Sequence, residues 1–151
     1  MYTLNKQIDV KASPDKVWEF ISHPRNLDRI TPEDMAFEIV SDVPEVMYNG
    51  LLVEYRVRIP FLGWKSWVSE IKHIVPGRSF VDEQKIGPYR FWYHEHQIES
   101  GSEGSRIVDR VSYEVPFGVI GRILHPLFIG PTLKRIFLHR ERTLRDLLGQ
   151  V

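Results

Sequence analysis

The chain has 151 residues, of which 42% are hydrophobic, 12% aromatic and 26% charged, as is typical of a globular protein long enough to bury a core. It has no cysteine, which excludes disulfide bonds, thiolate metal sites and cysteine nucleophiles. Twenty basic and twenty acidic side chains give a formal net charge of zero. We therefore expect no nucleic-acid partner, because phosphate binding needs a basic excess.

No segment of the sequence predicts secretion or a membrane span. The first ten residues, MYTLNKQIDV, lack the charged, apolar and small-residue order of a signal peptide, and no apolar run is long enough to cross a bilayer. We therefore expect a cytoplasmic protein. No repeat, linker or low-complexity block divides the chain, which predicts a single domain over residues 1–151.

The start of the chain predicts a strand followed by two short helices. Residues 2–10 place alternate apolar side chains on one face, as a strand does. Ser13 and Pro14 then form a helix start, and His23-Pro24 ends that helix. A second helical turn is predicted over residues 25–29, because Thr31-Pro32 stops it.

The middle of the chain predicts strands almost throughout. Alternating apolar residues between turn signals indicate strands over residues 37–41, 51–60, 67–75, 79–86, 91–99 and 106–115. Asn49-Gly50, Pro76-Gly77 and Gly87-Pro88 are the clearest of these turn signals. Connections this short predict that neighbouring strands pair as an antiparallel meander.

The C-terminal part returns to a helical period. Residues 116–130 mix glycine, proline and large apolar side chains and predict no regular element. From Pro131 to about Leu148 we predict a long helix with an apolar stripe made of Leu133, Ile136, Phe137, Leu144, Leu147 and Leu148. Six basic residues, Arg140 among them, follow Gly121 against two acidic ones, and we expect them on the solvent face. Strands followed by a long helix predict an α+β fold.

Several motifs resemble one superfamily. Residues 12–20 (ASPDKVWEF) and 26–32 (NLDRITP) resemble the opening of START-related helix-grip domains, the SRPBCC superfamily of polyketide cyclases/dehydrases and lipid-transport proteins. The later motifs are similar to an uncharacterised ligand-binding branch of it: Asp82 to Gln84, Gly87-Pro88, Trp92 to His96 and Asp109 to Val111. The resemblance covers the whole chain. It implies a curved antiparallel sheet of about seven strands that grips the C-terminal helix, with a cavity between them.

The stretch Trp92 to His96 (WYHEH) places two histidines on one face of a predicted strand. A five-residue loop after Ile86 predicts Gln84 opposite His94 and Asp82 opposite His96. Pairing across the loop at 99–106 predicts three more pairs: Asp109 with His96, Val111 with His94 and Tyr113 with Trp92. We therefore expect a polar row of Asp82, His96 and Asp109 across three strands.

Four interpretations of this polar row remain open. It can be a hydrogen-bonded network inside the sheet, or a set of polar contacts in a ligand cavity. It can also hold a general acid and base for a cyclisation or dehydration, with His94, His96, Asp82 and Asp109 as the catalytic candidates. Two histidines and a carboxylate also suit a metal, but a carboxylate that merely orients a histidine gives the same pattern, and we predict neither a metal nor another cofactor.

The first functional hypothesis is binding, with transport as an extension, of a hydrophobic small molecule such as a lipid, a polyketide or an isoprenoid. Because the sequence has no known catalytic motif, binding comes before catalysis. The predicted lining of the cavity is Val53, Tyr55, Val57, Trp67, Gln84, Trp92, His94, Tyr113, Phe128, Leu133 and Phe137. Of the two histidines, His94 is the predicted ligand contact and His96 the structural one.

Two other hypotheses belong to different classes of protein. The first is a cyclase or dehydratase that uses a buried pair of a histidine and an aspartate. The second is an interaction or regulatory domain that acts through the apolar loops at 60–64 and 117–120, which are also candidate gates of the cavity. Two interpretations of residues 117–129 and the basic helix stay open: a transient contact with an anionic membrane surface, or an apolar stripe that only packs on the sheet while the basic residues face solvent.

Overall fold

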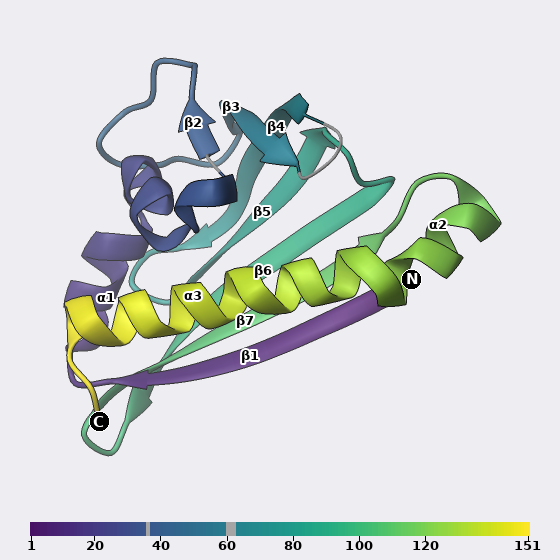
Figure 1. Cartoon of the computed structure of the whole chain (residues 1–151). Coiled ribbons are helices and arrows are strands. Elements are labelled where there is room, and N and C mark those ends of the chain that lie inside the picture. The colour runs from purple at the N-terminus through teal and green to yellow at the C-terminus, as the bar shows by residue number, and fades with distance from the viewer. Residues whose placement is uncertain (36, 60–62) are drawn as a thin grey trace.

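The computed structural model describes residues 1–35, 37–59 and 63–151. Among these residues, seven strands form one sheet in the order β1-β7-β6-β5-β4-β3-β2, and every neighbouring pair is antiparallel (Figure 1). The strands are β1 (Tyr2–Val10), β2 (Phe37–Ile39), β3 (Leu51–Ile59), β4 (Gly63–Val75), β5 (Ser79–Ile86), β6 (Phe91–Gly101) and β7 (Gly104–Glu114).

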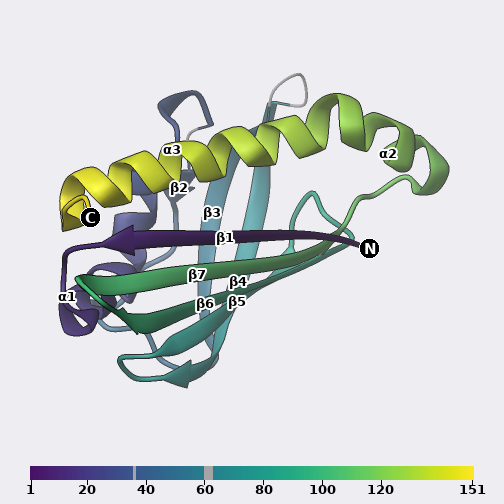
Figure 2. The ribbon, with the colours of Figure 1, turned by 90° about the horizontal axis from the view of Figure 1, so that it is seen from below.

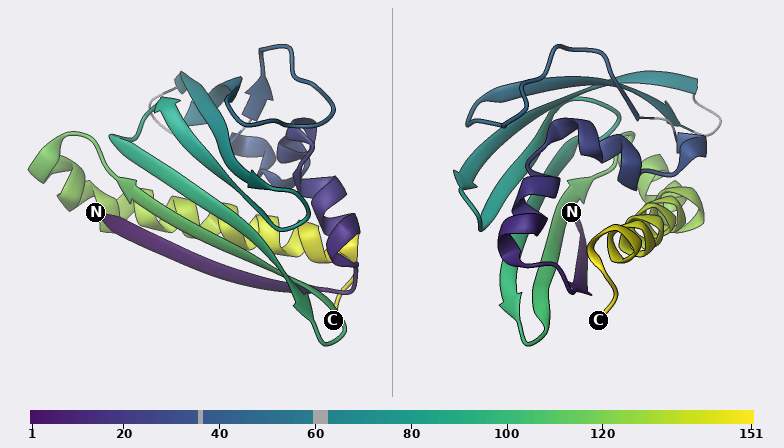
Figure 3. Two further views of the ribbon diagram at one scale, coloured as in Figure 1. Left: turned by 180° about the vertical axis from the view of Figure 1, so that it is seen from behind. Right: turned by 90° about the vertical axis from the view of Figure 1, so that its left-hand side faces the viewer.

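The helices follow β1 and β7 in the sequence, and they lie on one side of the sheet. They are α1 (Pro14–Ile21), η1 (Pro24–Ile30), η2 (Glu33–Met35), α2 (Gly118–Leu124), η3 (His125–Ile129) and α3 (Gly130–Leu148). Helix α3 runs alongside β1 (Figure 2). The sheet curves around α3 and the early helices (Figure 3). This is the α+β architecture that the element pattern predicts, with the helix grip that the resemblance implies.

The segment before α3 is helical, although the sequence predicts no element there. Helix α2 and the π-helical turn η3 lead directly into α3. Glycine and proline in this segment suggest breaks, but Gly121 has a packing role: a Cβ added there would lie 1.9 Å from the backbone oxygen of Pro116. The glycine therefore allows a close backbone approach rather than ending a helix.

Two apolar clusters make up the core. The smaller one closes the end of the fold near the C-terminus, where Ile8, Val17, Ile107 and Leu144 are almost fully buried. Leu144 anchors the last turns of α3 there, and full burial of such a side chain contributes about 1.5–3 kcal/mol. The larger cluster surrounds the space between β3 to β7 and the first half of α3. The smaller cluster thus fixes α3 to the sheet at one end of the fold, and the larger cluster surrounds the candidate site at the other end.

The register between β5 and β6 differs from the prediction by two residues. Asp82 lies opposite His94, and Phe80 lies opposite His96. The predicted pairing of Asp82 with His96 is therefore wrong, as is that of Gln84 with His94. The cross-strand row through His96 runs from Phe80 to Asp109 instead.

The turn between these strands also differs from the prediction. The ladder ends at the pair of Glu83 and Tyr93. Beyond it, the side-chain amide of Gln84 donates to the backbone oxygen of Tyr89 at 2.7 Å and accepts from its backbone nitrogen at 3.3 Å. The side chain thus replaces the next ladder bonds, so that the turn is longer than the glycine and proline signals indicate.

The register between β6 and β7 agrees with the prediction. The pairs are His96 with Asp109, His94 with Val111 and Trp92 with Tyr113. The strands also continue farther than predicted, to the pair of Gly101 and Gly104. One side of the histidine strand was thus predicted correctly and the other was not.

Candidate functional site

A cavity of about 580 Å³ lies between the sheet and α3 in the described part of the chain. Residues of β2 to β6, of the early helices and of α2, η3 and α3 line it. Its volume falls in the range of small-molecule sites, and most of its wall is aromatic or aliphatic. The fold therefore encloses a compartment suited to an apolar molecule.

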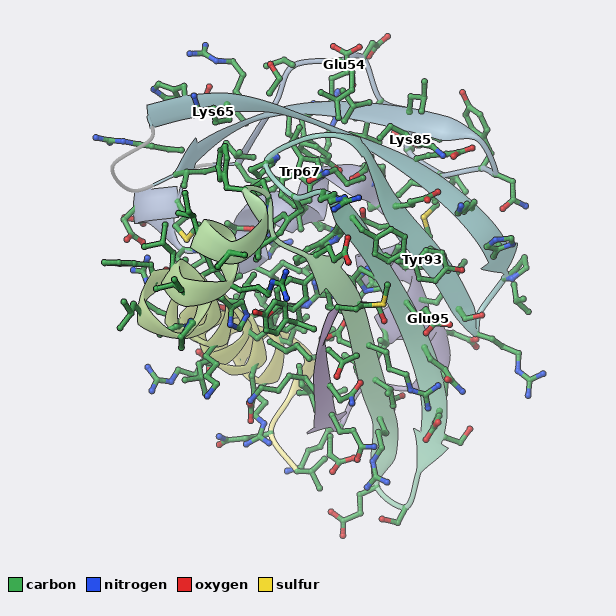
Figure 4. The ribbon with its side chains drawn as sticks, turned by 90° about the vertical axis from the view of Figure 1, so that its right-hand side faces the viewer. Glu54, Lys65, Trp67, Lys85, Tyr93 and Glu95 are labelled. Atoms are coloured by element: carbon green, nitrogen blue, oxygen red, sulfur yellow. The ribbon has the colours of Figure 1, made fainter. Side chains whose placement is uncertain are left out.

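Eight of the eleven predicted lining residues line this cavity: Tyr55, Val57, Trp67, Trp92, His94, Phe128, Leu133 and Phe137. The strand residues among them follow from alternation along the strands. Trp67 points inward, whereas Glu54, Tyr93 and Glu95 lie on the outer face of the sheet (Figure 4). The period of two thus separates the cavity wall from the solvent face.

Three predicted lining residues do not line the cavity. Val53 is completely buried among core side chains. Gln84 binds the backbone of Tyr89, as described above. Tyr113 shares a hydrogen bond of 2.7 Å between its hydroxyl and Nε2 of His125. Each of these three side chains contacts neighbouring protein groups instead of the cavity.

Several aromatic lining residues are absent from the prediction. They include Phe20, Phe37, Phe80 and Tyr89. Phe80 shares a face with Asp82, and its ring stacks on that of His96 with centroids 4.2 Å apart. Phe20 belongs to the apolar stripe of α1. The alternation and the stripe were thus available signals for these two residues.

Asp109 is the centre of a buried polar cluster. Its Oδ1 atom lies 2.9 Å from Nε2 of His94, 3.0 Å from Nδ1 of His96 and 3.3 Å from Nη2 of Arg140. Burial alone would raise the pKa of Asp109, but the Arg140 charge and the hydrogen bonds of the two histidines hold this pKa well below its ordinary value. The carboxylate is therefore ionised, and it does not itself line the cavity.

Arg140 is buried, and its predicted place on the solvent face of the last helix is wrong. The side chain is 6% exposed, and it lines the cavity beside Asp109 and His96. Its position follows from helical spacing, because Leu133, Phe137 and Leu144 form the buried face of α3 and Arg140 falls in the same row. The helical spacing thus indicates a buried position for Arg140, whereas its charge led to the prediction of a solvent-facing one.

His96 is neutral in the folded protein at ordinary pH. Burial and the nearby His94 lower the pKa of His96 to about 3, against the opposing effect of Asp109. A carboxylate accepts hydrogen bonds only, so Nε2 of His94 donates to Asp109. In neutral His94 the opposite ring nitrogen, Nδ1, is then an acceptor. Both histidines line the cavity.

Asp82 lines the cavity on the other side of His94. Its Oδ1 atom accepts a hydrogen bond of 2.7 Å from the Ser69 hydroxyl, which accepts one of 2.9 Å from Nε1 of Trp67. Burial raises the pKa of Asp82, although His94, Ser69 and Arg140 oppose this. The two aspartates near the histidines thus have pKa values pushed in opposite directions, one up and one down.

Asp82, His94 and His96 are also the residues that could hold a metal. One ligand atom from each lies within 4.8 Å of the other two. Two imidazoles and a carboxylate suit divalent transition metals, and Asp109 would orient both rings from behind. Because metal–ligand distances of about 2.0–2.2 Å bring such atoms closer together than this, binding would require the side chains to move inward.

The α2 and η3 segment forms an exposed apolar surface at one edge of the cavity. Phe117 is 76% exposed, and Ile120, Ile123 and Leu127 are each more than half exposed. Phe128 is exposed and also lines the cavity, as do other residues of the segment. We call residues 117–128 the apolar rim. Large exposed apolar patches mark interaction sites.

The other predicted gate lies mainly outside the described residues. The loop at 60–64 includes residues 60–62, which fall in that gap. Of its described part, Trp64 is 42% exposed, and the Arg56 guanidinium lies 4.8 Å from the centre of its ring. None of the helices in the described ranges is long and apolar enough to cross a membrane.

Comparisons with known proteins agree with the fold. Residues 10–135 match a family model described as polyketide cyclase / dehydrase and lipid transport. Protein CV1439 from Chromobacterium violaceum is 12% identical, with a TM-score of 0.74 over 100% of both chains. A START superfamily protein from Mycobacterium smegmatis is 15% identical, with a TM-score of 0.71 over 98% of this chain and 97% of that one.

A second protein from Mycobacterium smegmatis, Ms6760, is 16% identical, with a TM-score of 0.70 over 97% of this chain and 90% of that one. At such low identities these structures share the fold alone. No curated protein matches the sequence.

Proposed function

The chain belongs to the polyketide cyclase/dehydrase and lipid transport family, and from this premise we propose that it binds a hydrophobic small molecule between its sheet and α3. The cavity of about 580 Å³ carries the proposal. Protein interiors are close-packed, and voids larger than a water molecule are rare. A lined space of this size therefore supports a binding role rather than a packing defect.

The composition of the wall supports an apolar occupant. Aromatic side chains from five strands, β2 to β6, meet there, with Trp67 and Trp92 in edge-to-face contact at 5.4 Å. The polar side chains of the wall gather mainly around Asp82, His94 and His96. A large apolar wall with a few convergent polar groups is the usual construction of a site for a lipid, a polyketide or an isoprenoid.

Native mass spectrometry of the freshly purified protein is the experiment for this proposal. We expect a mass shift from a bound apolar compound that disappears after denaturing extraction, and the extract identifies the compound. A protein that carries no such mass, and whose mass does not shift after incubation with a lipid extract, would contradict the proposal.

We also propose that the ligand exchanges with a membrane across the apolar rim. Exposed Ile120 and Ile123 on α2 lie beside the exposed Arg122, a pairing suited to an anionic lipid surface. Neither isoleucine lines the cavity. The double variant Ile120→Ser/Ile123→Ser should therefore lose sedimentation with anionic vesicles but keep the cavity, while Leu138→Ser on the exposed face of α3 should change neither.

A self-association surface is the competing use of the apolar rim. Concentration-dependent dimers that the double serine variant abolishes, together with unchanged vesicle binding, would contradict the membrane proposal. They would support the interaction-domain hypothesis instead.

Acid–base catalysis is the second candidate function. The observation that favours it is the opposite displacement of two carboxyl pKa values, raised at Asp82 and lowered at Asp109, on either side of His94. Such a pair can hold a proton on one carboxyl while the other orients a base. If the co-purified compound is converted on incubation, Asp82→Asn should retain binding and lose the conversion. An unchanged rate would exclude this role of Asp82.

A further inference from the structure

The positive charge at the wall of the cavity is already neutralised by the protein. Arg140 is the only lysine or arginine that lines the cavity in the described ranges. Its guanidinium lies 3.3 Å from the Asp109 carboxylate, and His94 and His96 bind the same oxygen. A ligand carboxylate or phosphate placed here would find no unpaired cation. Burial of an unpaired charge is costly, so the wall disfavours an anionic ligand.

Hydrogen-bonding capacity nevertheless remains at this part of the wall. We call Asp82, His94 and His96 the polar patch; one N or O atom of each lies within 4.8 Å of the others. Nε2 of His94 donates to Asp109, and Nδ1 of His96 lies 3.0 Å from the same carboxylate and 3.2 Å from Nη2 of Arg140. The opposite nitrogen of each ring is turned away from that carboxylate. Oδ1 of Asp82 accepts a hydrogen bond from the Ser69 hydroxyl, and the second carboxyl oxygen, Oδ2, is a further polar atom of the patch. The patch therefore offers convergent polar atoms in a mainly apolar wall.

We propose that this cavity selects an uncharged apolar molecule that carries a hydroxyl or carbonyl oxygen, and that this oxygen binds the polar patch. The inference rests on the proposed binding function and adds the chemical class of the ligand. A hydroxyl group can donate and accept, and it matches a patch that contains both kinds of partner. A pure hydrocarbon would leave these buried polar atoms unpaired, which costs free energy.

A competition series tests the proposal with compounds that differ only in their head group. The neutral dye N-phenyl-1-naphthylamine reports occupancy of the cavity, and 1-decanol, 2-decanone, decane, decanoate and decylamine compete with it at neutral pH. We expect decanol or decanone to compete about fivefold to tenfold more strongly than decane, as one added hydrogen bond allows. We expect decanoate and decylamine to be at least about tenfold weaker than decanol.

Variants of the polar patch locate the effect. Asp82→Leu and His94→Phe should each reduce the ratio of decanol to decane affinity toward one, whereas Asp82→Asn should retain most of it. Tyr113→Phe is the matched control, because it removes a hydroxyl on the same face of the sheet that does not line the cavity. Because the ratio of decanol to decane affinity is taken within one variant, a loss of affinity that is the same for both compounds does not change it. Two patch variants also cover the case in which one of them fails to fold.

The outcomes separate this inference from the proposed function. If the dye does not bind and no compound competes, both proposals fail. If the dye binds but decanoate or decylamine competes as strongly as decanol, the selection of an uncharged ligand is wrong and the binding function stands. Stoichiometric zinc or iron in the purified protein that Asp82→Leu removes would also overturn the inference, because the patch would then hold a cation.

Discussion

Nη2 of Arg140, on the last helix, lies 3.3 Å from Oδ1 of Asp109, on β7, and both side chains are buried. This ion pair joins the helix to the sheet beside the cavity. It also sets the charge of the cavity wall, since it neutralises Arg140, the one arginine that lines the wall among the described residues. The same contact therefore bears on stability and on ligand selection.

Loss of one partner of this pair should destabilise the fold strongly. Arg140→Met leaves the Asp109 carboxylate buried without its counter-charge, and we expect the free energy of unfolding to fall by about 3–5 kcal/mol. Urea denaturation measures this change. The exposed Arg142→Met is the control and should change stability by less than about 0.5 kcal/mol.

The double variant Arg140→Met/Asp109→Asn should recover part of the loss, because no unpaired charge remains. Equal stability of Arg140→Met and the unmodified protein would contradict the account of the pair.

His96 should make the protein less stable as the pH falls. Burial lowers its pKa from 6.5 to about 3 in the folded state, so between these values the unfolded chain binds a proton that the folded protein does not. The free energy of unfolding should then decrease below about pH 6.5 by about 1.4 kcal/mol per pH unit. Asp109, whose folded pKa is lowered, adds its own loss only below its ordinary value of 3.8.

Urea unfolding at a series of pH values checks the direction. His96→Gln should flatten the slope between pH 6.5 and the acid limit. The exposed His73→Asn, at a positive φ of 53° that asparagine tolerates, should keep the slope. A slope that is identical in His96→Gln would show that another group is responsible.

Gly121→Ala should disrupt the packing of α2. The added Cβ would lie 1.9 Å from the Pro116 oxygen, which is part of the backbone and has little freedom to move. We expect a loss of about 1–3 kcal/mol, as for overpacking. Thermal unfolding measures it. Gly118→Ala is the comparison variant. A Cβ at Gly118 meets nothing within 4 Å, so any loss there comes from the strained φ of 52° and not from overpacking. A Gly121→Ala variant as stable as the unmodified protein would contradict the close approach.

Much of the fold could be predicted because its signals are local. Alternation along β3 and β6 indicates strands with one buried face, and the stripe through Leu133, Phe137 and Leu144 indicates the helix that the sheet grips. The α2 helix could not be predicted in the same way. Its glycine at 121 is needed for the close approach to the Pro116 backbone oxygen, and composition reads that glycine as a helix break.

The site was predictable where it follows from the alternation of one strand or from the register of β6 with β7. Trp92 and His94 line the cavity because β6 alternates. The residue of β5 opposite His94 was predicted wrongly, because glycine and proline signals do not show the turn's own hydrogen bonds, such as those of the Gln84 side chain with the Tyr89 backbone. Arg140 can be buried because its guanidinium forms an ion pair with the Asp109 carboxylate. A charged residue viewed alone in a sequence is expected to face solvent, so the burial of Arg140 was not predicted.

The most direct measurement of the central claim is a titration of N-phenyl-1-naphthylamine into the protein and two tryptophan variants of α3. Leu133→Trp adds bulk at a buried position of the cavity wall, whereas Leu138→Trp adds the same side chain at a position that is 46% exposed. We predict saturable binding to the unmodified protein and to Leu138→Trp, and binding at least about tenfold weaker to Leu133→Trp. Equal binding to both variants, or no saturable binding to any of the three proteins, would contradict the claim that the cavity is the ligand site.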